Sequence, residues 1–268
     1  MLRISGTGES HLGLVRAKNE DSAFVGPTCM LVADGVGGGA AGEVASATAA
    51  YAVAASALLH AGEDPATVLR QAVDLAQAQV RAGVAADPAR SGMATTLTAV
   101  ATDGTTFALA HLGDSRGYVF RDDELTRVTR DHSYVQELLD EGRLGEHEVA
   151  AHPWRNVVLR TVNGSADGEP DISALYLRPG DRILLASDGL TDLVEESVIA
   201  ETLASRADDD AVPALVAAAL ARGGRDNITC ALASVVDGPQ ISSDGMLLGA
   251  VRDPGNVVDL AAVRSVSA

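Results

Sequence analysis

The sequence is poor in aromatic residues and in cysteine. Aromatic side chains make up 3% of its 268 residues, so alanine, valine and leucine must fill the core of a chain that is 47% hydrophobic. A chain of this length forms one large domain or two small ones, and it can bury a full core without disulfides. Cys29 and Cys230 each lie inside an apolar run. We expect both to be buried, reduced thiols, which predicts a reducing compartment.

Basic residues are also scarce. The chain has 20 Lys and Arg against 37 Asp and Glu, a formal net charge of −17, which argues against nucleic acid or an anionic membrane as a partner. The N-terminal segment MLRISGTGES lacks the long apolar stretch of a signal peptide. The apolar stretch 44–61 is interrupted by polar residues and is too rich in alanine to resemble a membrane span. We therefore expect a soluble, cytoplasmic protein.

Several catalytic motifs are missing. The sequence has no nucleotide-binding P-loop, no G-x-S-x-G nucleophile turn and no EF-hand loop. Neither cysteine is followed by the glycine-rich turn and arginine of a thiol-based phosphatase. The histidines are scattered, with no pair at metal-binding spacing: His11, His60, His111, His132, His147 and His152. Other residues must carry the chemistry.

The sequence does contain a repeated pattern, an Asp at the edge of an apolar run. Residues 28–46 read TCMLVADGVGGGAAGEVAS, in which a buried-strand pattern stops at Asp34-Gly35 and more glycines follow. Such glycines let the backbone come close to a bound ion. Asp114, Asp188 and Asp226 stand in similar settings within HLGDSRG, LLASDGL and GRDNITC. Each Asp alone could simply cap a turn, but the repetition favours a shared site.

Carboxylates gathered at one end of packed sheets would be unstable alone, because neighbouring like charges raise each other's pKa. A divalent cation removes this conflict. Oxygen ligands without histidine or cysteine nearby favour Mg²⁺ or Mn²⁺ over Zn²⁺. Two such ions can share a bridging water and lower its pKa, which yields a nucleophile suited to phosphoryl transfer.

The order of the expected elements predicts an α+β fold. It suits antiparallel sheets covered by helix pairs rather than a doubly wound parallel sheet. The expected elements are strands within 2–6, 21–25 and 29–33 with a loop over 8–20, helices over 43–61 and 65–82, antiparallel strands between 94 and 133, a polar helical segment over 133–152, a hairpin over 171–189 turned at Pro179-Gly180, helices over 195–206 and 210–222, and a last strand over 227–236.

The chain resembles the metal-dependent protein serine/threonine phosphatases, the PPM or type 2C family, and looks most like the compact bacterial members. The resemblance is spread over residues 1–236, in the family's motif order. It rests on GLVRAKNEDS (13–22), VADGVGGGAAGEVAS (32–46), GMATTLTAV (92–100), LGDSRGY (112–118), TRDHSYVQELLDEGRL (129–144) with HPWRNVVLR (152–160), DRILLASDGLTD (181–192) and GGRDNITCALA (223–233).

The resemblance implies a four-layer αββα sandwich of two antiparallel sheets flanked by helix pairs, with two Mn²⁺ or Mg²⁺ ions between the sheet edges. It implies that Asp34 bridges both ions and that the backbone carbonyl of Gly35 binds one of them. Asp188 and Asp226 would complete the pair. Asp114 corresponds to the family's ligand for a third, weaker ion.

The resemblance also implies roles around the ions. Asp21 and Glu20 would hold metal-bound waters, Asn227 would lie behind the ligands, and Arg16 would grip the substrate phosphate with its guanidinium fork. The implied reaction is a single in-line attack by metal-bridging hydroxide on phosphoserine or phosphothreonine, without a phosphoenzyme.

Three positions depart from the family's pattern. Gly39 stands where many bacterial relatives carry His, and Val36 stands where eukaryotic relatives can carry a His general acid. The leaving group is then expected to take its proton from metal-bound water. Asn156 replaces a small hydroxyl residue common near the third ion, which affects that site alone. The principal ligands are intact.

The expected domain organisation is a catalytic domain over 1–237, with a flap insertion at about 131–165, and a C-terminal tail over 238–268 that either docks as extra strands or stays partly loose. The implied partners are phosphorylated proteins, targets of a serine/threonine kinase, and the chain is expected to be a monomer. Three alternatives remain: a phosphoprotein-binding module without turnover, a regulatory phosphatase for an anti-anti-sigma-type protein, and an acidic calcium-binding protein.

Overall fold

The computed structural model describes residues 1–36, 41–165, 168–239 and 245–265. Its strands are β1 (Leu2–His11), β2 (Asp21–Val25), β3 (Cys29–Val36), β4 (Ala94–Thr95), β5 (Leu97–Thr102), β6 (Phe107–Leu112), β7 (Arg116–Arg121), β8 (Glu124–Arg127), β9 (Asp171–Leu175), β10 (Arg182–Ala186), β11 (Ile228–Asp237) and β12 (Met246–Gly249). Its helices are α1 (Gly42–Leu59), α2 (Pro65–Ala86), α3 (Tyr134–Asp140), α4 (Glu146–Val149), α5 (Asp188–Thr191), α6 (Glu196–Ser205), α7 (Asp208–Ala221) and α8 (Ala262–Ser265), with 3-10 turns at Pro88–Arg90, Ala250–Arg252 and Pro254–Asn256.

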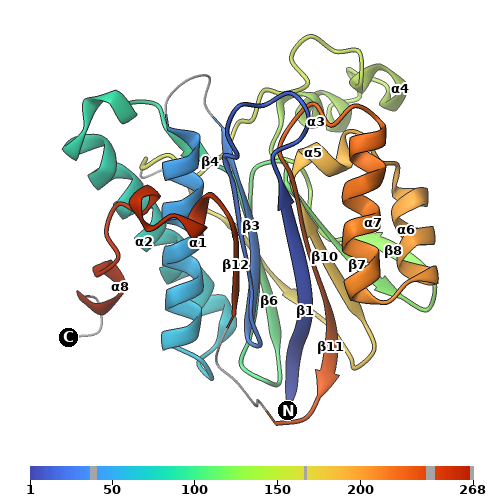
Figure 1. Cartoon of the computed structure of the whole chain (residues 1–268), viewed down its shortest axis with the longest axis horizontal. Helices are drawn as coiled ribbons and strands as arrows, with labels where there is room; N and C mark the ends of the chain where they lie inside the picture. Colours follow the sequence, from blue (N-terminus) through green and yellow to red (C-terminus); the bar gives the residue numbers. More distant parts are fainter. Residues whose placement is uncertain (37–40, 166–167, 240–244, 266–268) are drawn as a thin grey trace.

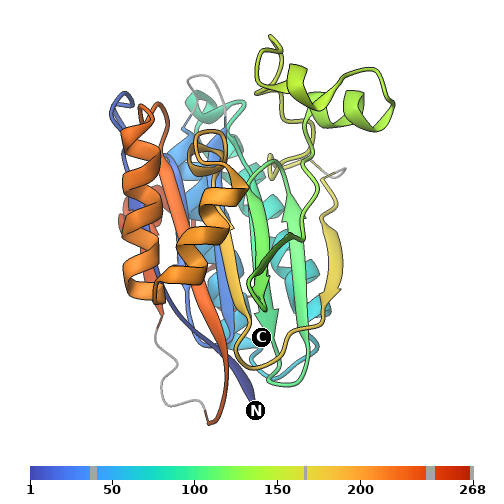
Figure 2. The same cartoon turned by 90° about the vertical axis from the view of Figure 1, so that its right-hand side faces the viewer.

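The strands form two antiparallel sheets that lie face to face between pairs of helices (Figure 1). One sheet has the order β1-β11-β10-β7-β8, and the other has the order β12-β2-β3-β5-β6-β9 with β4 paired to β3. Helices α1 and α2 cover the sheet that contains β3, and α6 and α7 cover the sheet that contains β10 (Figure 2). The expected four-layer αββα sandwich is confirmed.

Small aliphatic side chains fill the space between these layers. The contact between the two sheets is built from residues such as Ile4, Val32 and Ile183. Helix α1 packs on its sheet and on α2 largely through buried alanines, which are Ala45, Ala47, Ala49, Ala50, Ala52, Ala54 and Ala57. Since alanine is short, it lets a helix backbone approach its neighbours closely. Alanine, valine and leucine therefore fill the core, as the composition predicts.

Among the helices of the described ranges, α1 alone is long and apolar enough to cross a membrane by length and composition. However, 72% of that window is buried inside the protein. The packing of α1 in the core accounts for its apolar character.

Two predictions about strands are wrong. Residues 171–189 do not form a hairpin, because β9 pairs with β6 in one sheet while β10 pairs with β7 and β11 in the other. The turn at Pro179-Gly180 therefore carries the chain from one sheet to the other. The expected loop over 8–20 is also too long, because β1 continues to His11, which pairs with Ile228 of β11. Both errors come from pairing between segments that are distant in the sequence.

The described part of the predicted tail docks on the domain. Strand β12 pairs antiparallel with β2, from Met246 opposite Val25 to Gly249 opposite Ser22. The segment after β12 lies across α1 (Figure 1), and Val251 is among its buried side chains. Residues 240–244 and 266–268 of the tail lie outside the described residues. The boundary at residue 237 stays a prediction.

Candidate metal centre

The four Asp residues of the repeated pattern lie at one end of the two sheets. Asp34 is near the end of β3, and Asp114 is in the turn between β6 and β7. Asp188 begins α5 directly after β10, and Asp226 lies between α7 and β11. Both sheets therefore contribute carboxylates to the same end of the sandwich, beside α3 and α4 (Figure 1).

Asp34 and Asp21 face each other across the pairing of β2 with β3. Asp21 is 1% exposed, and the Ser187 hydroxyl donates to its Oδ2 over 2.8 Å. Its Oδ1 is buried without a hydrogen-bond partner, and burial raises the pKa of Asp21 to about 6. Burial, followed by the charges of Asp21 and Asp188, holds the pKa of Asp34 well above its usual range.

Asp188 and Asp114 are crowded in the same way. Burial and then the charges of Asp114 and Asp192 raise the pKa of Asp188 well above its usual range. Its Oδ1 is also buried without a hydrogen-bond partner. Burial and then the charges of Asp131 and Asp192 raise the pKa of Asp114 to about 7. These carboxylates carry negative charge at a cost that a nearby cation would remove.

Asn227 holds the loop that precedes β2. Its Oδ1 accepts a hydrogen bond from the Glu20 amide over 2.8 Å, and its Nδ2 donates to the carbonyls of Leu12 and Lys18 over 2.9 Å each. The Glu20 carbonyl in turn accepts from the Gly35 amide over 3.1 Å. Burial, followed by the charge of Glu43, raises the pKa of Glu20. Glu20 and Asn227 therefore lie behind the carboxylates, joined to Gly35.

Arg16 lies within the same site. Its Nη2 donates to Asp226 Oδ2 over 2.5 Å, and the Asn227 amide donates to Asp226 Oδ1 over 2.8 Å. The Arg16 side chain is half exposed. Asp226 thus has a cation beside it, unlike the carboxylates of Asp34 and Asp188.

The backbone around Asp34 is tightly held. Thr96 accepts from the Asp34 amide over 2.9 Å, and the Thr95 hydroxyl donates to the Asp34 carbonyl over 2.8 Å. A Cβ on Gly35 would lie 2.5 Å from the Gly42 carbonyl oxygen and 2.7 Å from that of Glu20. Only glycine fits at this position. Residues 37–40, with the departure at Gly39, lie outside the described residues.

A cleft of 990 Å³ opens beside the carboxylates. Asp114, Asp188 and Asp226 line it, together with residues of the expected flap that include Gln136 and Asn156. Asp192 also lines it, and burial raises the pKa of Asp192. The pattern of Asp residues at strand ends does not find Asp192. The sequence feature that could have identified Asp192 is its position four residues after Asp188, about one helical turn further along the chain.

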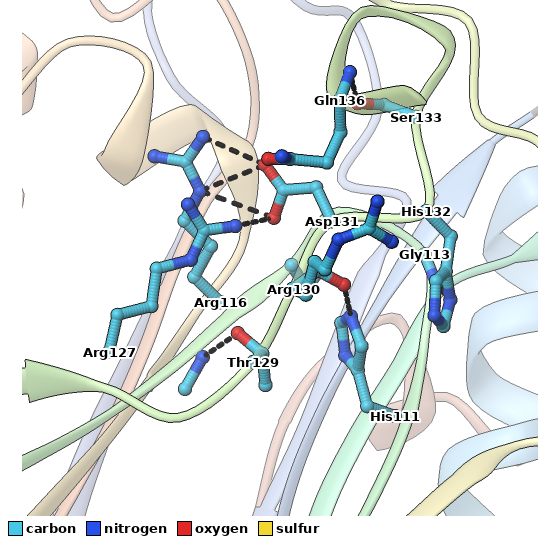
Figure 3. Close-up of polar contacts among 12 residues, drawn as sticks. His111, Gly113, Arg116, Arg127, Thr129, Arg130, Asp131, His132, Ser133 and Gln136 are labelled. Atoms are coloured by element: carbon cyan, nitrogen blue, oxygen red, sulfur yellow. Dashed lines mark hydrogen bonds and ion pairs between the residues drawn. The ribbon is translucent and has the colours of Figure 1, made fainter. Parts of the chain in front are cut away.

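The base of the flap is held by an ionic cluster (Figure 3). Arg116 donates to Asp131 Oδ2 from Nη2 over 2.8 Å and from Nε over 3.1 Å, and Arg127 bonds Asp131 Oδ1. Next to them, His132 Nδ1 accepts from the Gly113 amide over 3.1 Å. The chain returns through bridges that pair Ser133 with Val158 and Thr95 with Val162. Sequence reasoning did not single out Asp131, whose partners come from β7 and β8.

The residues present fit small, hard cations. Within the described ranges, no three Asp, Glu, His or Cys side chains are grouped as a finished ion site. The available donors are nevertheless all oxygen atoms, and Asp21 and Asp188 each keep a buried oxygen without a hydrogen-bond partner. Oxygen donors of this kind are the ligands that Mg²⁺ and Mn²⁺ prefer.

This fold is that of a known family. The model of the protein phosphatase 2C family matches residues 8–223, and the chain belongs to that family. Among its relatives, the serine/threonine protein phosphatase PstP of Mycobacterium tuberculosis is 42% identical over 242 residues, which cover 90% of this chain and 47% of PstP. The chain thus matches about half the length of that relative.

Two further comparisons agree. The serine/threonine phosphatase stp of Listeria welshimeri is 34% identical over 231 residues, 82% of this chain and 91% of that protein. The crystal structure of the PstP catalytic domain in complex with two manganese ions superposes with a TM-score of 0.79 at 40% identity, covering 88% of this chain and all of that one.

Proposed function

We propose that this chain is a metal-dependent protein serine/threonine phosphatase, which hydrolyses phosphoserine and phosphothreonine in proteins. The observation that carries the proposal is the set of crowded carboxylates at the end of a 2C-type sandwich, with oxygens of Asp21 and Asp188 buried and unpaired. The two manganese ions of the PstP catalytic domain support Mn²⁺ or Mg²⁺ as the cofactor here.

In this proposal Asp34, Asp188, Asp226 and the Gly35 carbonyl hold two ions, and Asp114 is a ligand for a third. When bound, the ions would supply Lewis-acid activation of the attacking water and neutralise charge on the phosphoryl oxygens.

The other side chains bind and orient. Asp21, fixed by the Ser187 hydroxyl over 2.8 Å, and Glu20 would accept hydrogen bonds from bound waters. Asn227 holds the loop that carries them. Arg16 would leave Asp226 and present its planar guanidinium to two oxygens of the substrate phosphate, a geometry that lysine cannot reproduce.

The partners follow from the activity. Protein phosphatase activity implies phosphoprotein substrates, and we propose that these are targets of a serine/threonine kinase in the cytoplasm. The net charge of −17 supports a protein without a nucleic-acid or membrane partner. We further propose a monomer whose catalytic domain spans 1–237, with the flap at about 131–165.

The direct test measures turnover of p-nitrophenyl phosphate and a phosphothreonine peptide against added Mn²⁺ and Mg²⁺. Turnover should need the metal, and Asp188→Asn should abolish it because a ligand is lost. Glu201→Gln, an exposed carboxylate on α6, is the matched control and should behave as the unsubstituted protein. Full turnover in excess chelator would refute the proposal, and metal-bound protein that takes up phosphopeptide without turnover would favour the binding module.

Arg16 is tested through substrate affinity. Arg16→Ala should raise the KM for phosphopeptide by roughly tenfold or more with a smaller change in kcat, because a charge-assisted contact to phosphate is lost. Arg16→Lys should fall between the two, and Arg70→Ala, an exposed arginine on α2, should change neither parameter. An unchanged KM in Arg16→Ala would remove the residue from substrate binding.

A further inference from the structure

Residues 245–263 form a strap along the edge of one sheet and across α1, beyond the range 8–223 that the family model matches. The strap begins with β12, which pairs with β2, the strand that starts at Asp21. Further along, the Val258 amide donates to the Thr48 hydroxyl over 3.2 Å, and the Tyr51 hydroxyl donates to the Leu260 carbonyl over 2.8 Å. Side chains of α1 therefore anchor its backbone.

Gly249 presses the strap against the backbone of Asp21. Its φ of 72° and ψ of −146° lie in a region that glycine alone adopts readily. A Cβ there would be 2.1 Å from the Asp21 carbonyl oxygen and 2.9 Å from Ser10 Oγ. Ser10 Oγ accepts from Asn19 Nδ2 over 2.8 Å, and Asn19 Oδ1 accepts from the Asp21 amide over 3.1 Å. Gly249 thus packs against the Asp21 carbonyl and against Ser10. The Ser10 hydroxyl in turn holds the Asn19 side chain that accepts from the Asp21 amide.

A directed chain of hydrogen bonds joins the strap to Glu20. The Val251 amide donates to Ser22 Oγ over 3.1 Å, Ser22 Oγ lies 3.0 Å from Ser46 Oγ, and the Ser46 hydroxyl donates to the Glu20 carbonyl. Ser46 has a single hydroxyl hydrogen, so Ser22 must be the donor in the middle bond. All three bonds then point the same way, an arrangement in which each bond strengthens the next.

We propose that the strap is a positioning element for the metal centre, acting through Gly249 on Asp21 and through Ser22 and Ser46 on Glu20. The Glu20 carbonyl also accepts from the Gly35 amide over 3.1 Å. The chain of hydrogen bonds from the strap therefore extends to Gly35, whose carbonyl is proposed to bind an ion. Gly249, Ser22 and Ser46 are positioning residues and touch neither ion nor substrate. The inference rests on the proposed function.

The test uses Ser22→Ala and Gly249→Ala in the full chain. Mn²⁺ affinity by titration calorimetry should fall roughly threefold to tenfold in Ser22→Ala, the equivalent of one buried hydrogen bond. Amide hydrogen exchange over residues 19–22, measured without added metal, should become faster in both variants. The kcat at saturating Mn²⁺ should change less than the Mn²⁺ concentration needed for half-maximal turnover.

The matched control is Gly255→Ala in the same strap, where the three atoms nearest to a Cβ would belong to the Asp253 side chain, at 3.1 Å or more. It should leave Mn²⁺ affinity and exchange at 19–22 unchanged. If Ser22→Ala and Gly249→Ala bind Mn²⁺ and exchange like the unsubstituted protein, whatever their melting temperatures, the strap does not position the site. If the unsubstituted protein itself shows no metal-dependent turnover, the proposed function has failed. The exchange data, measured without metal, still show whether the strap orders the backbone of residues 19–22.

Discussion

Individual carboxylates of the candidate metal centre hold their protons more tightly than ordinary aspartates. Burial raises the pKa of Asp21 to about 6 and that of Asp114 to about 7, against an ordinary value near 4. Between about pH 4 and pH 7 the folded protein therefore binds more protons at these groups than the unfolded chain does. Stability from these groups must then fall as the pH rises through that window.

Asp114→Asn tests this relation, because asparagine does not titrate. In chelator, the free energy of unfolding of the variant relative to the unsubstituted protein should rise from about pH 4 to pH 7, by more than about 1 kcal/mol. Buried His111, whose pKa burial lowers to about 4, acts in the opposite direction but is common to both proteins. Urea unfolding across this range makes the measurement, and a difference independent of pH would contradict the raised pKa.

Sequence reasoning found the residues that carry a local signal. Asp34 and Asp188 end apolar runs, so their place at a strand end could be predicted. Asp131 and Asp192 follow polar or helical residues, and nothing local sets them apart. The ion pair of Arg16 with Asp226 joins residues 210 positions apart, and only the folded chain brings these two together.

At the scale of structural elements, an ionic cluster around Asp131 holds the base of the flap. Asp131, of which 8% of the side chain is exposed, lies between Arg116 and Arg127 at the junction of β7, β8 and the flap (Figure 3). Both arginine side chains are mostly buried. Removal of a buried carboxylate leaves its cations unpaired, which costs much more than loss of an exposed ion pair.

Asp131→Asn should therefore lower the free energy of unfolding by about 3–5 kcal/mol. The control is Asp140→Asn, which removes the partly exposed ion pair between Asp140 and Arg130 within the flap region and should cost less than about 1 kcal/mol. Denaturant unfolding at fixed pH compares the two. Equal losses would mean that Asp131 is no more important than a surface carboxylate.

The sequence predicted the order and type of most elements but not all of their partners. The apolar periodicity of 65–82 marks α2, although the helix continues to Ala86. Pro179-Gly180 is a good turn signal, yet the same signal serves a hairpin and a crossing between sheets. Pairing partners depend on the packing of the whole chain, which local turn chemistry does not contain.

For the molecule as a whole, the site joins the two sheets. Asp21 and Asp34 belong to the sheet of β2 and β3, whereas Asp188 and Asp226 adjoin β10 and β11 of the other sheet. An ion held by carboxylates from both sheets would be bound only while the sheets are packed together. Metal binding should therefore stabilise the folded protein.

Mn²⁺ should raise the melting temperature of the unsubstituted protein in a concentration-dependent way. At one hundred times the dissociation constant, a single bound ion adds about 2.7 kcal/mol to the free energy of unfolding. Differential scanning fluorimetry should show a smaller rise in Asp188→Asn and, in Glu201→Gln, the same rise as in the unsubstituted protein. An equal rise in all three proteins would indicate binding away from the carboxylates.

The alanine-rich packing of α1 has a consequence for mutational surveys. Residues such as Ala49 and Val53 are fully buried in the core that α1 shares with α2 and the sheet, so a larger side chain would overpack it at a cost of about 1–3 kcal/mol. A saturation scan would consequently score Ala49 and Val53 as severely as the proposed ligand positions, although neither side chain has a part in the proposed chemistry. A map of intolerant positions alone would therefore mistake this tightly packed contact for a functional surface.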